Sequence, residues 1–375
     1  MAQLIAGVDP HKRSLTLAVV TAVGEPVTTA SFDNTTAGID GALAWLAGLD
    51  GPVLRVGVEG SAGHGRHLAG RLVENGTDVR EVPPRRTAAR RRARRRAKTD
   101  VEDAVAIARA TAGEPELGPV KPGAGLGPAV EELAIVRAHR DMLVARPTVM
   151  LNRAEAALAR LPLAITDRVG TGRAVLPRLR ALAALEPTTA RAGAGSLVVT
   201  AQLGMLTELH TDIDELTRRI RGLERRLAAL IDACGSTLLA EHGIGVVGAA
   251  TLLVEVGDPA RFRNEGAFNR WWGGAPVAIS SGEGHGDPVR HRLDLLGNRA
   301  VNSVLYTASI TQARCHEPAQ TYLASKTTQG HGPRQARRAH KTLLGRRIIR
   351  RMWADRRRQL QPHHTTPPLD DHAAA

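Results

Sequence analysis

The run LIAGVDPHKRSLTLAVV, residues 4–20, contains two apolar stretches separated by a short polar turn. The stretches cover residues 4–8 and 15–20, and both are typical of β-strands in length and composition. The run therefore predicts a β-hairpin. Asp9 directly follows the first stretch, so we expect its carboxylate to emerge at the end of a strand.

A second acid at a strand end follows further along the chain. Residues 37–49 are predicted to form a helix, and the apolar run 53–58 is typical of another strand. Glu59 closes this run as Asp9 closes the first. Further predicted elements are strands at 27–32 and 78–82 and a helix at 65–74. This alternation over residues 1–112 predicts an α/β domain.

Asp100 and Asp103 begin the next predicted helix, residues 101–112, and Thr99 before them is a typical N-cap. Their three-residue spacing points both carboxylates to one helix face. Carboxylates crowded with those of Asp9 and Glu59 repel one another unless divalent cations share them, and oxygen ligands favour Mg²⁺ or Mn²⁺. Two such ions, roughly 3.5 to 4 Å apart, stabilise the attacking and leaving oxygens of a phosphate.

The four acids therefore predict two-metal phosphodiester chemistry on an RNase H-like sheet. An ordinary explanation remains open for each acid taken singly. Carboxylates are common at strand ends and in first helical turns, where the helix dipole favours them. The order of the four along the chain favours the catalytic interpretation.

Composition points to a nucleic-acid partner. The chain has 375 residues, of which 43% are apolar, and this suffices for two or three folded domains. The formal net charge of +14 predicts a polyanionic partner. Cys234 and Cys315 lie far apart and outside any CxxC pattern, so neither a disulfide framework nor a zinc site is indicated. No apolar run approaches the ~20 residues of a membrane span, so we expect no membrane partner and a cytoplasmic location.

The densest positive charge lies between the last predicted strand of the α/β domain and the Asp100 helix. It comprises Arg85, Arg86, Arg90, Arg91, Arg92, Arg94, Arg95, Arg96 and Lys98. We expect this segment to contact the phosphates of DNA or RNA, which charge alone does not distinguish. The alternative is a solvated basic loop.

Residues 113–127 have the glycine- and proline-rich composition of a linker. Beyond it, two heptad patterns predict a helical coiled-coil region over residues 128–236, with 162–196 as its tip. The patterns consist of Val136, Leu143, Met150 and Ala157, and of Leu209, Ile213, Leu216, Ile220, Leu223, Leu227 and Leu230. The helices can pair with each other or with another copy of the chain, and the sequence favours neither.

Residues 237–330 are predicted to form a mainly helical domain. Gly243-Ile244-Gly245, before an apolar run, resembles a helix-hairpin-helix turn, whose backbone N–H groups bind phosphate; a simple tight turn fits equally well. Residues 276–292 are rich in glycine, serine and histidine and predict a loop, which contains Ser280-Ser281-Gly282. The aromatic residues nearby are expected in the core, and these are Phe262, Phe268, Trp271 and Trp272.

The last part of the chain is strongly basic. Residues 334–358 carry eleven Lys or Arg residues against one acid, Asp355, and predict a basic amphipathic helix within a tail of residues 331–361. Nucleic acid is a more economical partner for it than a membrane surface, because the arginine-rich segment also needs one. Residues 362–375 are expected to be disordered.

These motifs occur in one order along the chain. Asp9 lies in Gly-Val-Asp-Pro-His-Lys, Glu59 in Val-Glu-Gly-Ser, and Asp100 and Asp103 in Lys-Thr-Asp-Val-Glu-Asp-Ala; the heptads, Gly-Ile-Gly and Ser281-Gly282 follow. Over roughly residues 1–350 the chain resembles the DEDD-type insertion-sequence transposases, also called bridge-RNA-guided serine recombinases. In that family a RuvC-like domain supplies the four acids, and a C-terminal transposase domain supplies a nucleophilic serine.

The resemblance implies roles for individual residues. Asp9, Glu59, Asp100 and Asp103 would bind Mg²⁺ (or Mn²⁺), and Ser281 would attack a DNA phosphate to form a covalent phosphoserine. Ser281 is chosen over Ser280 because it lies directly before Gly282, as the serine of the family does. Nucleic acid would contact Gly243, Gly245, Asn298 and Arg299, the last two in the glycine-asparagine motif of the family. His285, Arg290 and His291 lie near Ser281 in sequence, and either assist it or are solvated in the loop.

The resemblance further implies a bacterial, nucleoid-associated enzyme that acts on donor and target DNA as a dimer or tetramer. A non-coding bridge RNA would pair with both DNAs. The predicted fold is α/β plus all-α: a RuvC-like domain (1–112), the linker, the coiled-coil region, the transposase domain (237–330) and the basic tail.

Two other functions remain open. A RuvC-like metal-dependent nuclease or Holliday junction resolvase would hydrolyse DNA with water and form no protein–DNA adduct. A non-catalytic RNA-binding protein would not need the four acids.

Overall fold

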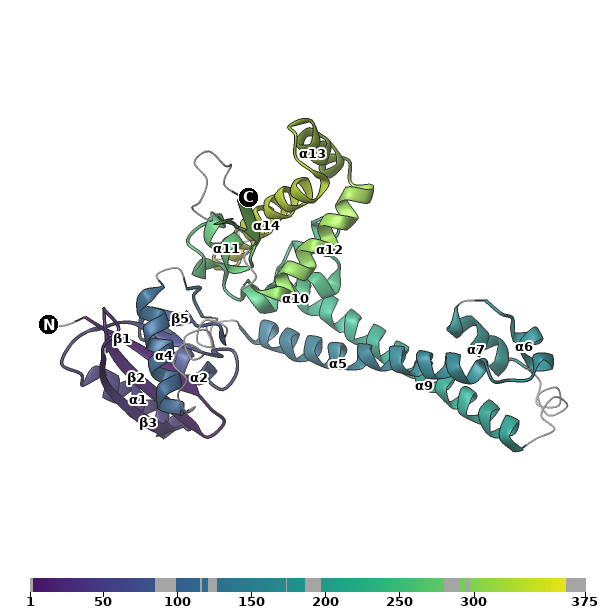
Figure 1. The fold of residues 1–375 in the computed structure, drawn as a ribbon, viewed down its shortest axis with the longest axis horizontal. Helices are drawn as coiled ribbons and strands as arrows, with labels where there is room; N and C mark the ends of the chain where they lie inside the picture. Colours follow the sequence, from purple (N-terminus) through teal and green to yellow (C-terminus); the bar gives the residue numbers. More distant parts are fainter. Residues whose placement is uncertain are drawn as a thin grey trace, which may run out of the picture. The chain divides into compact units, whose positions relative to one another are not determined.

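The computed structural model describes residues 3–84, 99–114, 117–120, 127–172, 174–185, 197–279, 290–293 and 297–361 (Figure 1). The chain divides into two compact units. The first comprises Met1–Val130 and Cys234–Ala375, and the second comprises Glu131–Ala233. Within the described ranges, no helix is long and apolar enough to cross a membrane.

The first unit begins with a five-stranded mixed sheet in the order β3-β2-β1-β4-β5. β1 (Leu4–Pro10), β2 (Ser14–Thr21) and β3 (Pro26–Asp33) pair antiparallel, so the predicted hairpin is confirmed. β4 (Val53–Val58) runs parallel to β1, and β5 (Val79–Glu81) runs parallel to β4. Parallel neighbours need crossover connections, which α1 (Thr36–Ala47) and α2 (Arg66–Glu74) supply.

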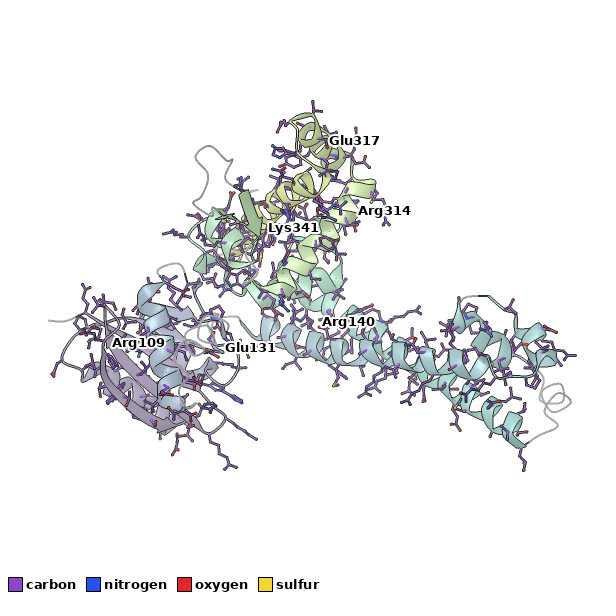
Figure 2. All side chains as sticks on the ribbon, in the orientation of Figure 1. Arg109, Glu131, Arg140, Arg314, Glu317 and Lys341 are labelled. Carbon is purple, nitrogen blue, oxygen red and sulfur yellow. The ribbon has the colours of Figure 1, made fainter. Side chains whose placement is uncertain are left out.

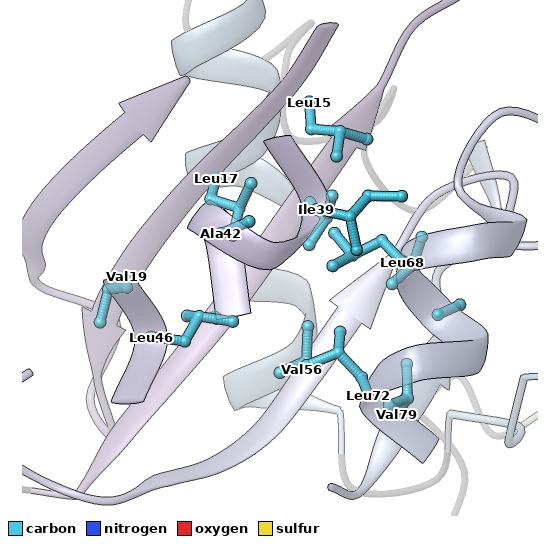
Figure 3. Close-up of a cluster of buried hydrophobic side chains, with 14 of the residues drawn as sticks. Leu15, Leu17, Val19, Ile39, Ala42, Leu46, Val56, Leu68, Leu72 and Val79 are labelled. Carbon is cyan, nitrogen blue, oxygen red and sulfur yellow. The ribbon is translucent and has the colours of Figure 1, made fainter. Parts of the chain in front are cut away.

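The alternation of side chains along a strand decides what covers each face of the sheet. Leu4, Ala6 and Val8 on β1 face a core that α1 and α2 complete (Figure 3). Labelled members of this core are Leu15, Leu17, Val19, Ile39, Ala42, Leu46, Val56, Leu68, Leu72 and Val79. Each fully buried aliphatic side chain of this kind contributes roughly 1.5–3 kcal/mol. Ile5, Gly7 and Asp9 therefore face the opposite side.

That opposite face is covered by α4 (Asp100–Gly113), which packs Ala108 against Ile5. Glycines on the strands let the helix approach closely. A Cβ at Gly7 would overlap the backbone nitrogen of Ala108, and a Cβ at Gly57 would overlap Thr111 Oγ1. Arg109 (Figure 2) fixes the helix further by donating a 2.9 Å hydrogen bond to the carbonyl of Gly24. This packing brings the first turn of α4 to the end of β1.

Part of the predicted linker adds to the edge of this sheet. The backbone of Glu81 donates to the carbonyl of Gly118 at 2.9 Å, and Val120 donates to the carbonyl of Val79 at 3.3 Å. Leu117 and Val120 are buried, which explains why this stretch packs despite its glycine- and proline-rich neighbours. It also satisfies the open hydrogen-bonding edge of β5.

The second unit is a helical hairpin. α5 (Gly127–Leu158) and α9 (Leu197–Ala233) pair antiparallel, and Arg140 (Figure 2) bridges them through a 2.9 Å ion pair with Glu224. At the tip, α6 (Leu163–Val169) and α7 (Val175–Ala183) share a core with Leu158 and Leu206. Three members of the second heptad pattern are buried, namely Ile213, Leu216 and Leu227. The two helices thus pair within the chain, and pairing with another copy stays a prediction.

Helices dominate the C-terminal part of the first unit, as predicted. They are η1 (Leu238–Ala240), α10 (Val246–Val256), η2 (Pro259–Arg261), α11 (Glu265–Trp271), α12 (Arg299–Cys315), α13 (Glu317–Thr328) and α14 (Pro333–Leu360). Phe262, Phe268 and Trp272 are buried, as expected for core aromatics, whereas Trp271 is only partly buried. The predicted basic tail helix is α14. Its apolar face is buried inside the unit, with Leu344, Ile348 and Ile349 at its centre.

The prediction that residues 276–292 form a loop is wrong at both ends of this range. β6 (Pro276–Ile279) and β7 (Arg290–Leu293) form a two-stranded antiparallel sheet, with Val277 opposite Arg292. Each strand has only four residues, so the glycine-rich composition between them hides the strand signal. Ser281 lies in sequence between these two strands.

Arg261 connects the C-terminal helices to the sheet. Its Nη1 donates a 2.6 Å hydrogen bond to the carbonyl of Pro119. Its guanidinium lies 4.5 Å and 4.7 Å from the ring centroids of Phe262 and Trp271, within the range of cation–π attraction. Burial lowers the pKa of Arg261 to about 10, although Glu81 and two other acids oppose the shift. The side chain stays protonated at neutral pH.

Candidate metal centre and nucleic-acid contacts

Three side chains converge at the end of β1. His11 Nε2 lies 3.3 Å from Asp9 Oδ2 and 3.3 Å from Asp100 Oδ1. One ligand atom from each of these three residues lies within 4.8 Å of the others, close enough for one ion to contact all three. The predicted meeting of Asp9 with the α4 acid Asp100 is thus present in the structure, and His11 joins it.

The surroundings of Asp9 disfavour its own negative charge. Burial raises the pKa of Asp9, His11 opposes this shift, and the carboxylates of Asp103 and Asp100 raise the pKa further. The net pKa lies above the usual value for an aspartate. A cation placed between these carboxylates would reverse the balance, because opposite charge favours the ionised form.

Asp103 and Glu59 flank this cluster. Asp103 lies on the first turn of α4, is buried, and acts electrostatically on Asp9. Glu59 follows β4, and its backbone donates a 3.3 Å hydrogen bond to the carbonyl of Val8, beside Asp9. Strand alternation from Gly57 places Glu59 on the face that α4 covers. Within the described part of the chain, the group able to share one ion includes neither of these two acids.

The N-cap predicted for α4 is confirmed. Thr99 Oγ1 accepts a 3.2 Å hydrogen bond from the backbone nitrogen of Glu102. The cap occupies one of the free N–H groups at the helix start and fixes where the helix begins. Asp100 and Asp103 therefore take the first and fourth positions of α4.

Two side chains that sequence reasoning missed hold the loops around the cluster. Asn34 Nδ2 donates to the carbonyls of His11 at 2.9 Å and His64 at 3.0 Å, and so ties the β1–β2 turn to the segment after Glu59. Glu81 accepts hydrogen bonds from Ser61 Oγ and from the backbone nitrogens of Gly60 and Ser61, the latter two at 3.2 Å. Burial raises the pKa of Glu81 above its ordinary value.

The donor set fits a divalent cation. The contact between His11 and Asp9 has the geometry of an ion pair, and it leaves Asp9 Oδ2 buried without a hydrogen-bond partner among the described residues. Carboxylate oxygens suit Mg²⁺ and Mn²⁺, and an imidazole nitrogen adds a ligand of the kind found in transition-metal sites. Asp9, His11 and Asp100 are therefore the residues best placed to hold an ion.

Several predicted site residues lie outside the described residues. These are Ser280, Ser281 and His285 and the basic segment Arg85, Arg86, Arg90, Arg91, Arg92, Arg94, Arg95, Arg96 and Lys98. Arg290 and His291 belong to β7. The roles assigned to all of them stay predictions.

The remaining predicted nucleic-acid contacts differ in their surroundings. Gly243 has a positive φ of 81° and packs against Ala308 of α12, which explains the glycine without a ligand. Gly245 precedes α10, and a Cβ there would meet no atom within 4 Å. Asn298 caps α12 by accepting a 2.9 Å hydrogen bond from Val301, and it donates to Glu255 at 3.0 Å. Arg299 beside it is exposed.

Two family models match the chain. A model of DEDD transposases of the IS110 type, described as a transposase, matches residues 6–161. A second, described as the transposase of the IS116/IS110/IS902 family, matches residues 236–324. No curated protein matches the chain. Both models are named for transposases, so the label of serine recombinase that accompanied the resemblance is wrong.

Proposed function

The chain belongs to the DEDD-type insertion-sequence transposases, and we propose that it cuts and rejoins DNA at a metal centre formed by Asp9, Glu59, Asp100 and Asp103. The observation that carries this proposal is the convergence of Asp9 and Asp100, from β1 and α4, on His11 Nε2, which lies 3.3 Å from a carboxylate oxygen of each. The strand order β3-β2-β1-β4-β5 supports an RNase H-like assignment of the sheet domain.

The acids of the centre would act on the phosphate through the ions that they hold. Held by these acids, Mg²⁺ or Mn²⁺ would supply Lewis-acid stabilisation of the scissile phosphate and of the attacking oxygen. Asp9 and Asp100 would orient this charge from two elements that pack rigidly against each other at Gly7 and Ala108. His11 would add a nitrogen ligand to the same ion.

Ser281 is proposed as the nucleophile. Its Oγ would form a bond to phosphorus while one P–O ester bond of the DNA strand breaks, which leaves a phosphoserine and a free deoxyribose hydroxyl. The serine proton leaves as the bond forms, and the departing oxygen takes up a proton. Attack by the hydroxyl of another strand would then reverse the step, rejoin the DNA and release the serine. The match of the second family model to residues 236–324, which include Ser281, supports this assignment.

Partners beyond DNA are proposed from the family resemblance. A non-coding bridge RNA would supply sequence recognition by base pairing while the protein contacts backbones. The net charge of +14 supports the binding of RNA and DNA, which are both polyanions. A dimer or tetramer would bring serines and acids of different protomers together. The heptad positions along α5 and α9 are compatible with coiled-coil pairing, which would be one route to that assembly.

Covalent trapping tests the serine step. Purified protein is incubated with Mg²⁺ and DNA that carries the ends of its own insertion sequence, then denatured and resolved by gel electrophoresis. We expect a protein–DNA adduct that is abolished by Ser281→Ala and by chelation of the metal. Ser280→Ala is the matched control and should retain the adduct.

The same experiment separates the competing functions. An adduct that persists in Ser281→Ala and disappears in Ser280→Ala would reject the chosen nucleophile. Strand cleavage without any adduct would indicate hydrolysis by water, as in a junction resolvase. Sequencing RNA that co-purifies with the protein tests the guide, and recovery of only random cellular RNA would contradict it.

A further inference from the structure

An open surface pocket lies in the C-terminal part of the first unit, between η1 and α14. It has a volume of about 350 Å³ and is lined by Ala354 and by six polar or charged residues, Thr237, Glu241, Arg347, Arg350, Arg351 and Arg358. The four arginines follow the helical spacing of one face of α14. We refer to these six residues as the arginine pocket.

The inner wall of the arginine pocket is fixed by a buried acid. The side chain of Glu241 is 1% exposed and pairs with Arg347 at 2.7 Å and Arg351 at 3.6 Å. Gln312 also donates to Glu241 at 3.2 Å. Arg351 Nη1 further contacts Thr237 Oγ1 at 3.3 Å. The two inner guanidinium groups are therefore held in place before any ligand arrives.

The outer arginines are also anchored, yet accessible. Arg350 pairs with Glu265 and Arg358 with Asp355. Their side chains are nevertheless 64% and 59% exposed, so most of their N–H donors face solvent. The position of Asp355 is also fixed by a 2.8 Å hydrogen bond that it accepts from the backbone nitrogen of Thr237.

The chemistry of the lining specifies an anion. Four guanidinium groups and one carboxylate line the arginine pocket, and that carboxylate is already shared by two of the arginines. Arg351 Nε is buried without a hydrogen-bond partner among the described residues. Guanidinium donors match the oxygens of phosphate in paired geometry.

We propose that the arginine pocket binds a phosphodiester group of a nucleic-acid backbone. The basic composition of residues 334–358 predicted a charged helix, but it did not predict a preformed pocket on one part of it. The proposal rests on the proposed function only for the class of partner. It is independent of the metal centre and of the serine step.

The test removes charge from the arginine pocket without unpairing its buried acid. The variant is Arg350→Gln with Arg358→Gln. After these changes Glu265 keeps Arg346 at 3.8 Å, and Asp355 keeps its two hydrogen bonds from Thr237 at 2.8 Å. The matched control is Arg334→Gln with Arg337→Gln, which removes the same charge from exposed positions of α14 outside the pocket.

Affinity for random-sequence duplex DNA and for random-sequence RNA is measured by fluorescence anisotropy over a range of salt concentrations. For the pocket variant on duplex DNA we expect the slope of log affinity against log salt to fall by about one, since the pocket holds one phosphodiester group and each lost phosphate contact removes about one. On RNA the slope should also fall, by somewhat less per contact. A loss confined to DNA or to RNA identifies which nucleic acid occupies the pocket. A third variant, Arg350→Lys with Arg358→Lys, should recover part of the affinity because charge returns without the paired donors.

Equal losses in the pocket variant and the control would show diffuse attraction by α14 and would overturn the proposal. Unchanged affinity of the pocket variant for both probes would overturn it as well. Circular dichroism verifies that each variant is folded. If the pocket variant contradicts the pocket proposal while the Ser281-dependent adduct still forms, the pocket proposal is overturned and the proposed function is not.

Discussion

The carboxylates around Asp9 lie among like charges, whereas each arginine of the arginine pocket lies beside a carboxylate. Burial, Asp103 and Asp100 raise the pKa of Asp9, and His11 offsets this only in part. In the arginine pocket, Glu241 forms ion pairs with two arginines, and Glu265 and Asp355 each form an ion pair with one. A cation from solution would therefore stabilise the acid cluster, while the arginine pocket presents donors that the fold already holds in position.

The largest effect is expected from the acid cluster. Asp100→Asn should reduce adduct formation by more than about 100-fold, because even the residues behind a metal ligand affect activity by 10- to 100-fold. Glu102→Gln, on the same turn of α4, is the matched control and should change the rate only a few-fold. The gel assay for the adduct measures both. A rate that is lowered equally in the two variants would indicate a general charge effect instead of a ligand.

Gly7→Ala should separate the packing of the acid cluster from its charge. The added Cβ would overlap the backbone of Ala108, so we expect destabilisation of about 3 kcal/mol or more. Gly204→Ala on α9 is the control, because a Cβ there meets nothing within 4 Å. It should stabilise the helix by about 0.5–1 kcal/mol. Denaturant unfolding measures both, and a neutral Gly7→Ala would contradict the close seating of α4.

Glu241→Gln tests whether the buried carboxylate of the arginine pocket holds the two inner arginines. The change leaves Arg347 and Arg351 without their buried counter-charge, so it should destabilise the protein by about 1–3 kcal/mol. Thermal unfolding at neutral pH measures the effect. An unchanged melting temperature would mean that the inner arginines are not held by Glu241.

Asp9→Asn should have the smallest effect on stability, and the opposite sign. A raised pKa in the folded state means that the contribution of Asp9 to stability is fully present below its unfolded pKa and is lost as pH rises through its folded pKa. In chelator at neutral pH the variant should therefore melt at a slightly higher temperature than the natural protein. Added Mg²⁺ should stabilise the natural protein and not the variant. A lower melting temperature of Asp9→Asn in chelator would contradict the crowding of like charges.

Sequence patterns predicted the sheet domain well, because its signals are local. The apolar runs before Asp9 and Glu59 and the cap at Thr99 specify strands and a helix start without long-range information. The two strand ends and the start of α4 meet at one point because α4 packs closely on Gly7 and Gly57. No local sequence pattern reveals this packing. His11 was missed, although it lies two residues after Asp9 and alternation places both on one side of an extended chain.

Other features were out of reach for different physical reasons. Asn34 acts on carbonyls 23 and 30 residues away, so its sequence neighbours give no sign of it. Arg261 is one arginine among many in a basic chain, and only burial distinguishes it. β6 and β7 were hidden by glycine-rich composition. The arginine pocket depends on Glu241, which lies over 100 residues before its partners.

Because α4 packs closely on Gly7, the number of residues between Asp100 and Ala108 is fixed. Asp100 lies eight residues before Ala108, a little over two helical turns and roughly 12 Å along the axis. One residue inserted in this interval would rotate Asp100 by about 100° around the helix and carry it away from Asp9. Insertions and deletions between these two positions should consequently be absent from related enzymes. They should be tolerated only beyond Thr111, where α4 makes its close contact with Gly57.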